Sequence, residues 1–239
     1  MPLMRLLPHV VFALCLLAFA GCVTPARMDV SPATTPDSAG LVDIRTLVPD
    51  IDLDIRYAGR NNFTGAVVDG YGAPRCYLLE PAAKAIQRAE TALRSQGHRL
   101  RIFDCYRPAR AVRAFVSWAN NPDESTKARF YPALDKRALL GEYISPTSGH
   151  SRGATIDLTL MRCGAPGSCT PLDMGTDFDF FDTLASTDSP RVTQEQRANR
   201  DRLRDAMRQA GLRNYPMEWW HFTLGPEPAP KTFFDVPIE

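Results

Sequence analysis

The sequence predicts a single α+β domain with a mostly antiparallel central sheet flanked by helices. Short segments of alternating apolar and polar residues are separated by helical segments, and they lack the repeated strand-helix period of a parallel α/β fold. The chain has 239 residues, of which 44% are hydrophobic and 23% are charged, a composition that suits one globular core. No internal repeat, Gly-rich phosphate loop or Gly-x-Ser-x-Gly elbow interrupts this pattern.

The first half of the chain predicts two strands around a helix. Residues 51–57 alternate between apolar and polar side chains, which indicates a strand. Glu80 and Pro81 open a helix whose small and apolar residues recur on one face, and Gly97 ends it. Residues 100–104 then predict a second strand.

The second half continues the same alternation of elements. Residues 107–118 predict a loop that turns into a helix, and residues 154–160 alternate as a strand does. Thr193 and Gln196 have the spacing of a capping box, which predicts the start of a last helix. Residues 219–224 predict the final strand.

The N-terminus predicts export as a lipoprotein. An apolar run of 11 residues at positions 10–20 is too short to span a membrane, which needs about 20 helical residues. It ends in Phe19-Ala20-Gly21-Cys22, which resembles a bacterial lipobox, so residues 1–21 are the predicted signal and Cys22 the predicted lipidation site. Phe19 stands where leucine is usual, which leaves a plain secretory signal as the alternative.

The predicted location is therefore the periplasmic face of the cell envelope, and Val23 after the cysteine indicates the outer membrane. Residues 22–40 are rich in Pro, Thr, Ser and Ala, which predicts a flexible tether before a folded domain at 41–239. Contact with a membrane is expected only through the lipid anchor. The 28 Lys and Arg residues balance 27 Asp and Glu residues, and this charge excludes a general nucleic-acid binder.

Apart from Cys15 in the signal and Cys22 at the lipidation site, four cysteines remain, an even number that predicts two disulfides in an oxidising compartment. Cys163 and Cys169 flank a turn-forming loop and are expected to pair locally, which leaves Cys76 for Cys105. A zinc site made of the four thiolates is the alternative, although the spacing lacks the close cysteine pairs typical of such sites.

Two histidines lie beside acidic residues in polar strings and predict a metal site. A catalytic zinc ion takes three protein ligands and leaves a position for water, and His150, Asp157 and His221 supply that set. Glu218 precedes His221 by three residues and is the candidate general base. The alternative for each residue is structural, because a histidine among aromatic residues is often hydrogen-bonded in a core and an aspartate often caps a turn.

Several short polar and aromatic strings are spread along the chain. They are Asn62-Phe63-Thr64-Gly65, Asp69-Gly70-Tyr71, Asp104-Cys105-Tyr106-Arg107-Pro108, Ser148-Gly149-His150-Ser151-Arg152-Gly153, Ile156-Asp157-Leu158-Thr159-Leu160, Met174-Gly175, Phe178-Asp179-Phe180 and Glu218-Trp219-Trp220-His221. In order and spacing they resemble the VanX-type D-alanyl-D-alanine dipeptidases, which are zinc metallopeptidases related to D,D-carboxypeptidases. The resemblance covers about residues 51–237.

The resemblance implies a role for each matching residue. One zinc ion per chain is implied at His150, Asp157 and His221, with Glu218 as the catalytic base. Arg107 matches the arginine that stabilises the oxyanion-like transition state, a task that suits a fixed guanidinium.

The implied substrate is a small dipeptide, D-Ala-D-Ala. Ser148 matches the residue near the substrate carboxylate, and Tyr57 and Asp179 match the pocket for the free ammonium. The chain departs from cytoplasmic members in its leader, in its four cysteines and in the insertion that holds two of them. These departures favour recycling or scavenging of D-alanine in the envelope. The alternatives are a D,D-carboxypeptidase or endopeptidase acting on peptidoglycan stem peptides, and a non-catalytic wall-binding or metal-binding lipoprotein.

Overall fold

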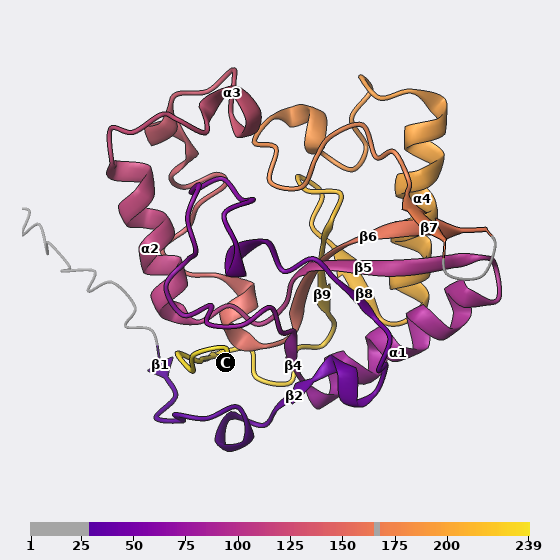
Figure 1. Ribbon diagram of the computed structural model, residues 1–239, viewed down its shortest axis with the longest axis horizontal. Helices are drawn as coiled ribbons and strands as arrows, with labels where there is room; N and C mark the ends of the chain where they lie inside the picture. Colours follow the sequence, from indigo (N-terminus) through magenta and orange to yellow (C-terminus); the bar gives the residue numbers. More distant parts are fainter. Residues whose placement is uncertain (1–28, 165–167) are drawn as a thin grey trace, which may run out of the picture.

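The computed structural model of the protein describes residues 29–164 and 168–239 (Figure 1). The strands are β1 (Asp29–Val30), β2 (Leu41–Asp43), β3 (Asp52–Leu53), β4 (Tyr77–Leu79), β5 (His98–Asp104), β6 (Thr155–Cys163), β7 (Cys169–Pro171), β8 (Leu212–Asn214), β9 (His221–Leu224) and β10 (Thr232–Phe233). The α-helices are α1 (Glu80–Arg94), α2 (Ala109–Asn120), α3 (Lys127–Phe130) and α4 (Gln194–Gln209).

The α+β prediction is confirmed, and the sheet is mixed. The main sheet has the order β3-β5-β6-β9-β8, and β7 pairs with the outer part of β6. Every pairing in this sheet is antiparallel except that of β3 with β5. Two short sheets, β2 with β4 and β1 with β10, lie beside it.

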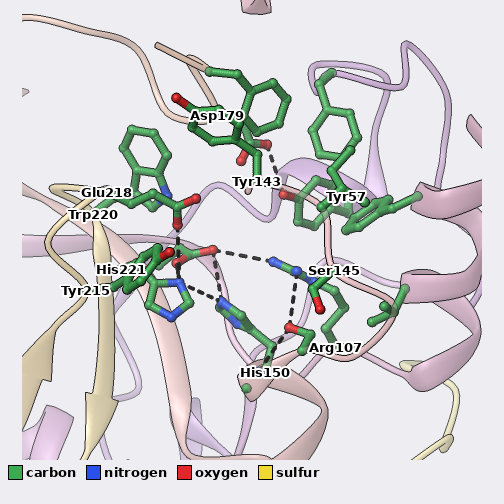
Figure 2. Close-up of a pocket in the computed structure, with 18 of the residues that line it drawn as sticks. Tyr57, Arg107, Tyr143, Ser145, His150, Asp179, Tyr215, Glu218, Trp220 and His221 are labelled. Carbon is green, nitrogen blue, oxygen red and sulfur yellow. Dashed lines mark hydrogen bonds and ion pairs between the residues drawn. The ribbon is translucent and has the colours of Figure 1, made fainter. Parts of the chain in front are cut away.

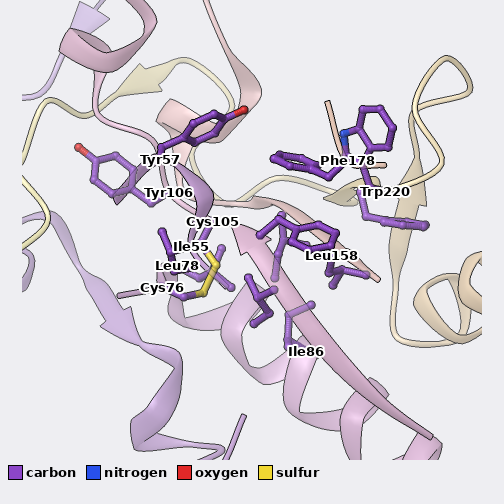
Figure 3. Packing of buried hydrophobic residues seen from close by; sticks show 14 of the residues in the cluster. Ile55, Tyr57, Cys76, Leu78, Ile86, Cys105, Tyr106, Leu158, Phe178 and Trp220 are labelled. Carbon is purple, nitrogen blue, oxygen red and sulfur yellow. A yellow bond between two sulfur atoms is a disulfide. The ribbon is translucent and has the colours of Figure 1, made fainter. Parts of the chain in front are cut away.

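Helices α1 and α4 contact each other and pack on the main sheet (Figure 1). The apolar face of α1 is buried, and Ile86 lies in the core together with Leu158 of β6 (Figure 3). Gly97 follows the helix with a φ of 71°, a left-handed conformation that glycine adopts without steric cost. The predicted capping box of α4 is also present, with Thr193 and Gln196 each accepting a backbone hydrogen bond from the other residue.

Two strand predictions differ from the structure. The segment predicted as a strand at 51–57 forms only β3, after which a 3-10 helix at Arg56–Ala58 turns the chain towards the interior. The segment predicted as a strand at 219–224 begins at His221, because the N–H of His221 bonds back to the carbonyl of Glu218 in a tight turn. This strand is also followed by β10.

The predicted signal peptide and Cys22 lie outside the described residues. Residues 29–40, which we predicted as the end of a flexible tether, are ordered against the domain, because β1 pairs in parallel with β10 and the N–H of Ser31 donates to Phe233 O at 2.8 Å. Within the ranges 29–164 and 168–239, no helix has the length and apolar character needed to cross a membrane.

Candidate active site

Three ionisable side chains form a row across the main sheet. Asp104 on β5 stands opposite Asp157 on β6, and Asp157 stands opposite His221 on β9. Directly opposed residues on antiparallel strands point to the same face with their Cβ atoms about 5 Å apart. The register of the ladder therefore brings Asp157 and His221 together without help from any loop.

His150 reaches the same place from the 3-10 helix Gly149–Arg152, which immediately precedes β6. Ser148 caps this helix by accepting a hydrogen bond from the His150 N–H at 3.2 Å. On the imidazole, Nδ1 lies 2.7 Å from the backbone carbonyl oxygen of Cys105. Since a carbonyl only accepts, Nδ1 carries the proton and Nε2 presents its lone pair to the site.

The three predicted metal ligands converge in the structure. Asp157 Oδ2 lies 3.2 Å from His150 Nε2, Asp157 Oδ1 lies 3.1 Å from His221 Nδ1, and the ligand atoms all lie within 4.8 Å of one another. Oδ1 of Asp157 is buried and, although His221 Nδ1 lies close to it, accepts no well-directed hydrogen bond, as expected of an oxygen that binds a cation. Two imidazoles and a carboxylate are a donor set typical of catalytic zinc, so these residues fit the ion.

The pKa shifts of His150 and Asp157 suit a metal ligand, whereas that of His221 does not: burial acts to lower the pKa of His221, but the hydrogen bond and charge of Asp157 outweigh it and raise the pKa. Burial lowers the pKa of His150, which favours the neutral imidazole that a metal requires. For Asp157, burial acts to raise the pKa, but the neighbouring His150 and His221 outweigh it and hold the pKa below its usual range. The carboxylate is therefore charged.

Glu218 lies in the turn before β9, with Oε2 at 3.4 Å from His221 Nδ1. Burial is the main cause that raises the pKa of Glu218 to about 7, and the charge of Asp157 acts in the same direction. A carboxyl group with a pKa near 7 exchanges protons readily at neutral pH, which is the property of a general base.

Arg107 is held by Asp104, a carboxylate to which the sequence analysis assigned no role. Its Nε donates to Asp104 Oδ2 at 2.9 Å, and its Nη2 forms an ion pair with the same oxygen at 2.8 Å. Asp104 also accepts a hydrogen bond from Tyr71 Oη at 2.6 Å. The guanidinium reaches Ser148 Oγ at 3.4 Å and lies 3.5 Å from Asp157 Oδ2. One sequence signal could have identified Asp104. It is an acid at the end of the apolar segment 100–104, and a buried acid needs a partner.

The opposite end of the site contains a second buried acid. Tyr57, on the 3-10 helix Arg56–Ala58, donates a hydrogen bond from Oη to Asp179 Oδ2 at 2.9 Å. Both residues are at most 5% exposed. Burial raises the pKa of Asp179 well above its usual value, and the charge of Asp157 raises it further. Such a carboxyl group favours a cationic ligand beside it.

All the predicted catalytic, metal and substrate residues line one cavity of about 230 Å³. Figure 2 shows Tyr57 and Asp179 facing Glu218 and His221 across this cavity, with Arg107 at one side. Tyr143, Ser145 and Tyr215 also line it, and the sequence did not single them out. They belong to loops without a periodic pattern, so no sequence signal marked them.

Both predicted disulfides are present. Cys76 is bonded to Cys105, with Cα atoms 5.3 Å apart, and Cys163 is bonded to Cys169, with Cα atoms 4.1 Å apart. The alternative zinc site of four thiolates is therefore wrong, because all four sulfur atoms are in disulfide bonds.

The sequence of this chain is similar to those of known proteins over most of its length. The peptidase M15 family described as D-ala-D-ala dipeptidase matches residues 37–239. The chain belongs to this family. It is 37% identical over 202 residues to the D-alanyl-D-alanine dipeptidase of Enterococcus faecium, which covers 84% of this chain and 98% of the relative. It is 41% identical over 194 residues to the D-alanyl-D-alanine dipeptidase of Streptomyces coelicolor, a match that covers 80% of this chain and 95% of the relative. The Escherichia coli K12 protein of the same name is 32% identical over 188 residues, covering 79% and 86%.

Membership of this family makes the chain an enzyme, a metallopeptidase of a family that depends on zinc in general. The cluster of His150, Asp157 and His221 is the place within the described chain where such an ion fits.

Proposed function

We propose that this protein hydrolyses the dipeptide D-Ala-D-Ala to two molecules of D-alanine, using one zinc ion per chain and Glu218 as the general base. The observation that carries the proposal is the arrangement of the cavity. At one end of the cavity lie Glu218 and the ligand cluster around Asp157. At the other end lies the buried Asp179 with Tyr57. A small zwitterion fits between these ends.

His150, Asp157 and His221 would hold the zinc ion, which would act as a Lewis acid towards the scissile carbonyl and would lower the pKa of a water to about 7. Glu218 accepts a proton from that water as its oxygen attacks the carbonyl carbon, and then returns the proton to the nitrogen of the leaving D-alanine when the C–N bond breaks. Arg107 donates to the negative charge that develops on the carbonyl oxygen. Asp104 holds the Arg107 guanidinium in place for this step.

The substrate is oriented by residues at both ends of the cavity. In this proposal Asp179 and Tyr57 receive the free ammonium, and Ser148, which also lines the cavity, binds the terminal carboxylate. A longer peptide has an acylated nitrogen in place of the ammonium, and it would leave the buried Asp179 without a cationic partner at a cost of a few kcal/mol. This arrangement supports a dipeptide as the substrate rather than a peptidoglycan stem.

We also propose that the enzyme works on the periplasmic face of the envelope, anchored through Cys22. The leader sequence and the two disulfides support this location, because disulfides persist in oxidising compartments. Mass spectrometry of the mature N-terminus tests the anchor. A diacylated Cys22 is expected, and a free N-terminus produced by cleavage at another position would contradict it.

The decisive experiment compares turnover of D-Ala-D-Ala, L-Ala-L-Ala and a stem pentapeptide by the zinc-loaded protein. We expect hydrolysis of D-Ala-D-Ala that a chelator abolishes and zinc restores. A Glu218→Gln variant should retain zinc and lose about 10²- to 10⁴-fold in kcat. Preference for the pentapeptide would indicate a carboxypeptidase instead, and zinc binding without turnover of any peptide would indicate a binding protein.

A further inference from the structure

We propose that the Cys76–Cys105 disulfide is a positioning element of the active site, which fixes the backbone carbonyl that orients the metal ligand His150. The inference rests on the proposed metal site and adds to it a requirement for this covalent bond.

The carbonyl in question belongs to Cys105. It accepts the hydrogen bond from His150 Nδ1 at 2.7 Å, and this bond sets both the tautomer and the direction of the ring. His150 is 1% exposed, so the contact is shielded from bulk solvent. Partners of this kind change metal affinity by about 10- to 100-fold when they are lost.

The backbone at Cys105 is not held by the main sheet. Strand β5 ends at Asp104, and its register with β6 shifts between Ile102 and Asp104. The next N–H groups donate elsewhere, that of Tyr106 to Tyr77 O at 2.9 Å and that of Arg107 to His150 O at 3.3 Å. The position of the Cys105 carbonyl therefore depends on contacts beyond the end of the ladder.

The partner cysteine is tied to the other support of His150. Cys76 leads directly into β4, and the N–H of Leu79 at the end of β4 donates to Gly153 O at 2.7 Å. Gly153 is the residue that ends the 3-10 helix carrying His150. The disulfide thus joins the strand that holds the His150 helix to the segment that supplies its hydrogen-bond acceptor.

The bond is also enclosed. Cys76 is fully buried and Cys105 is 2% exposed, and Figure 3 shows the sulfur atoms beside Ile55 and Leu78. A side-chain substitution cannot remove a backbone carbonyl. Removing the disulfide is therefore the way to alter the position of the Cys105 carbonyl by mutation. Without the bond, the Cys105–Tyr106 peptide is tied to β4 only by the hydrogen bond from the Tyr106 N–H to Tyr77 O, and the imidazole of His150 is held less firmly.

The second disulfide provides a matched control. Cys163 and Cys169 close the turn between β6 and β7, and Asp157 lies six residues earlier on the same strand. At about 3.3 Å per residue this places the control bond roughly 20 Å from the metal ligands. Neither cysteine lines the cavity formed by the described residues.

The test compares the variants C76A/C105A and C163A/C169A with the unmodified protein. Zinc affinity is measured by competition with a chromogenic chelator, the His150 tautomer by side-chain nitrogen NMR of the protein, and stability by thermal unfolding. We expect C76A/C105A to bind zinc about 10- to 100-fold more weakly and to show a mixed tautomer at His150, with kcat reduced more than KM is raised. C163A/C169A should show a lower Tm and unchanged zinc affinity.

Equal zinc affinity and an unchanged tautomer in C76A/C105A, with a lower Tm alone, would overturn the proposal and leave the bond a purely structural element. If C76A/C105A fails to fold, C76V/C105A restores lost volume and receives the same measurements, with the same two outcomes. Zinc affinity and tautomer do not depend on the substrate. A protein that shows the expected shifts but does not hydrolyse D-Ala-D-Ala would therefore refute the proposed function and keep this inference.

Discussion

The two ends of the cavity are built in different ways. At the metal end, Asp157 and His221 are direct partners in an antiparallel ladder, so backbone hydrogen bonds of the main sheet fix their separation. At the other end, Tyr57 lies on a single 3-10 turn and Asp179 lies in a loop with a φ of 61°. The difference shows that a ladder provides proximity through its register, whereas a loop site needs added supports.

Arg200 of α4 is one such support. Its guanidinium is 1% exposed and donates to three backbone carbonyls, those of Met174, Leu184 and Ser186. These carbonyls flank the loop that carries Asp179. Burial lowers the pKa of Arg200 to about 10, so it stays charged at neutral pH and its hydrogen bonds are charge-assisted.

The largest expected effect comes from breaking the metal end. Asp157→Ala removes the central residue of the row and leaves the imidazoles of His150 and His221 without their carboxylate. We expect zinc binding to be lost and kcat/KM to fall by roughly 10³-fold or more, which corresponds to several kcal/mol of transition-state stabilisation. Zinc content and kcat/KM are the measurements. Asp52→Ala, which removes a partly exposed acid paired with Arg101 at the edge of the sheet, is the control and should retain both.

A smaller and more selective effect is expected at the loop end. Asp179→Asn keeps the size of the side chain but removes its charge, so the substrate ammonium loses a charge-assisted hydrogen bond. KM for D-Ala-D-Ala should rise about 10- to 100-fold, while zinc affinity stays unchanged. A variant in which zinc affinity falls together with KM would show that the two ends are not independent.

The same variant should alter the pH dependence of stability. The pKa of Asp179 is raised in the folded protein, so the folded state binds a proton that the unfolded state releases, and stability falls as pH rises from the ordinary pKa towards the raised one. An asparagine at this position does not titrate, so the variant does not lose stability in this way as pH rises. Without substrate, the Tm advantage of Asp179→Asn should grow as pH rises from about 4, the ordinary pKa of an aspartate, towards neutrality, by about 2–4 °C for each kcal/mol. A constant difference in Tm across this range would contradict the assignment.

The smallest effect is expected from the support of the loop. Arg200→Lys keeps a charge but cannot reach three carbonyls with one planar group. We expect KM to rise by about 3- to 10-fold, equivalent to about 1 kcal/mol, with unchanged zinc affinity. Arg202→Lys, on an exposed position of the same helix, is the matched control. If both variants behave alike, Arg200 does not act through the loop.

The difference between the two ends of the cavity also explains which residues the sequence could predict. Metal chemistry permits few residue types, so His150, Asp157, His221 and Glu218 could be chosen from their strings, and local rules were enough for the start of α4 and the end of α1. The sequence assigned no role to Asp104, because only the folded chain shows that Asp104 holds Arg107 beside Asp157 on β6. The pairing of β1 with β10 joins residues about 200 positions apart, and no local pattern specifies such a contact. The strand at 51–57 was overextended because alternation does not reveal where pairing with a neighbour stops.

The left-handed backbone at Asp179 restricts how this enzyme can diverge. Asparagine and glycine share aspartate's tolerance of that conformation, whereas glutamate would keep the charge at a backbone cost of about 1–2 kcal/mol. Evolution at this position can therefore discard the carboxylate more easily than it can lengthen it. A descendant carrying asparagine would keep the turn and no longer demand a free amine, so the fold leaves a short mutational route from a dipeptide substrate towards acylated peptides.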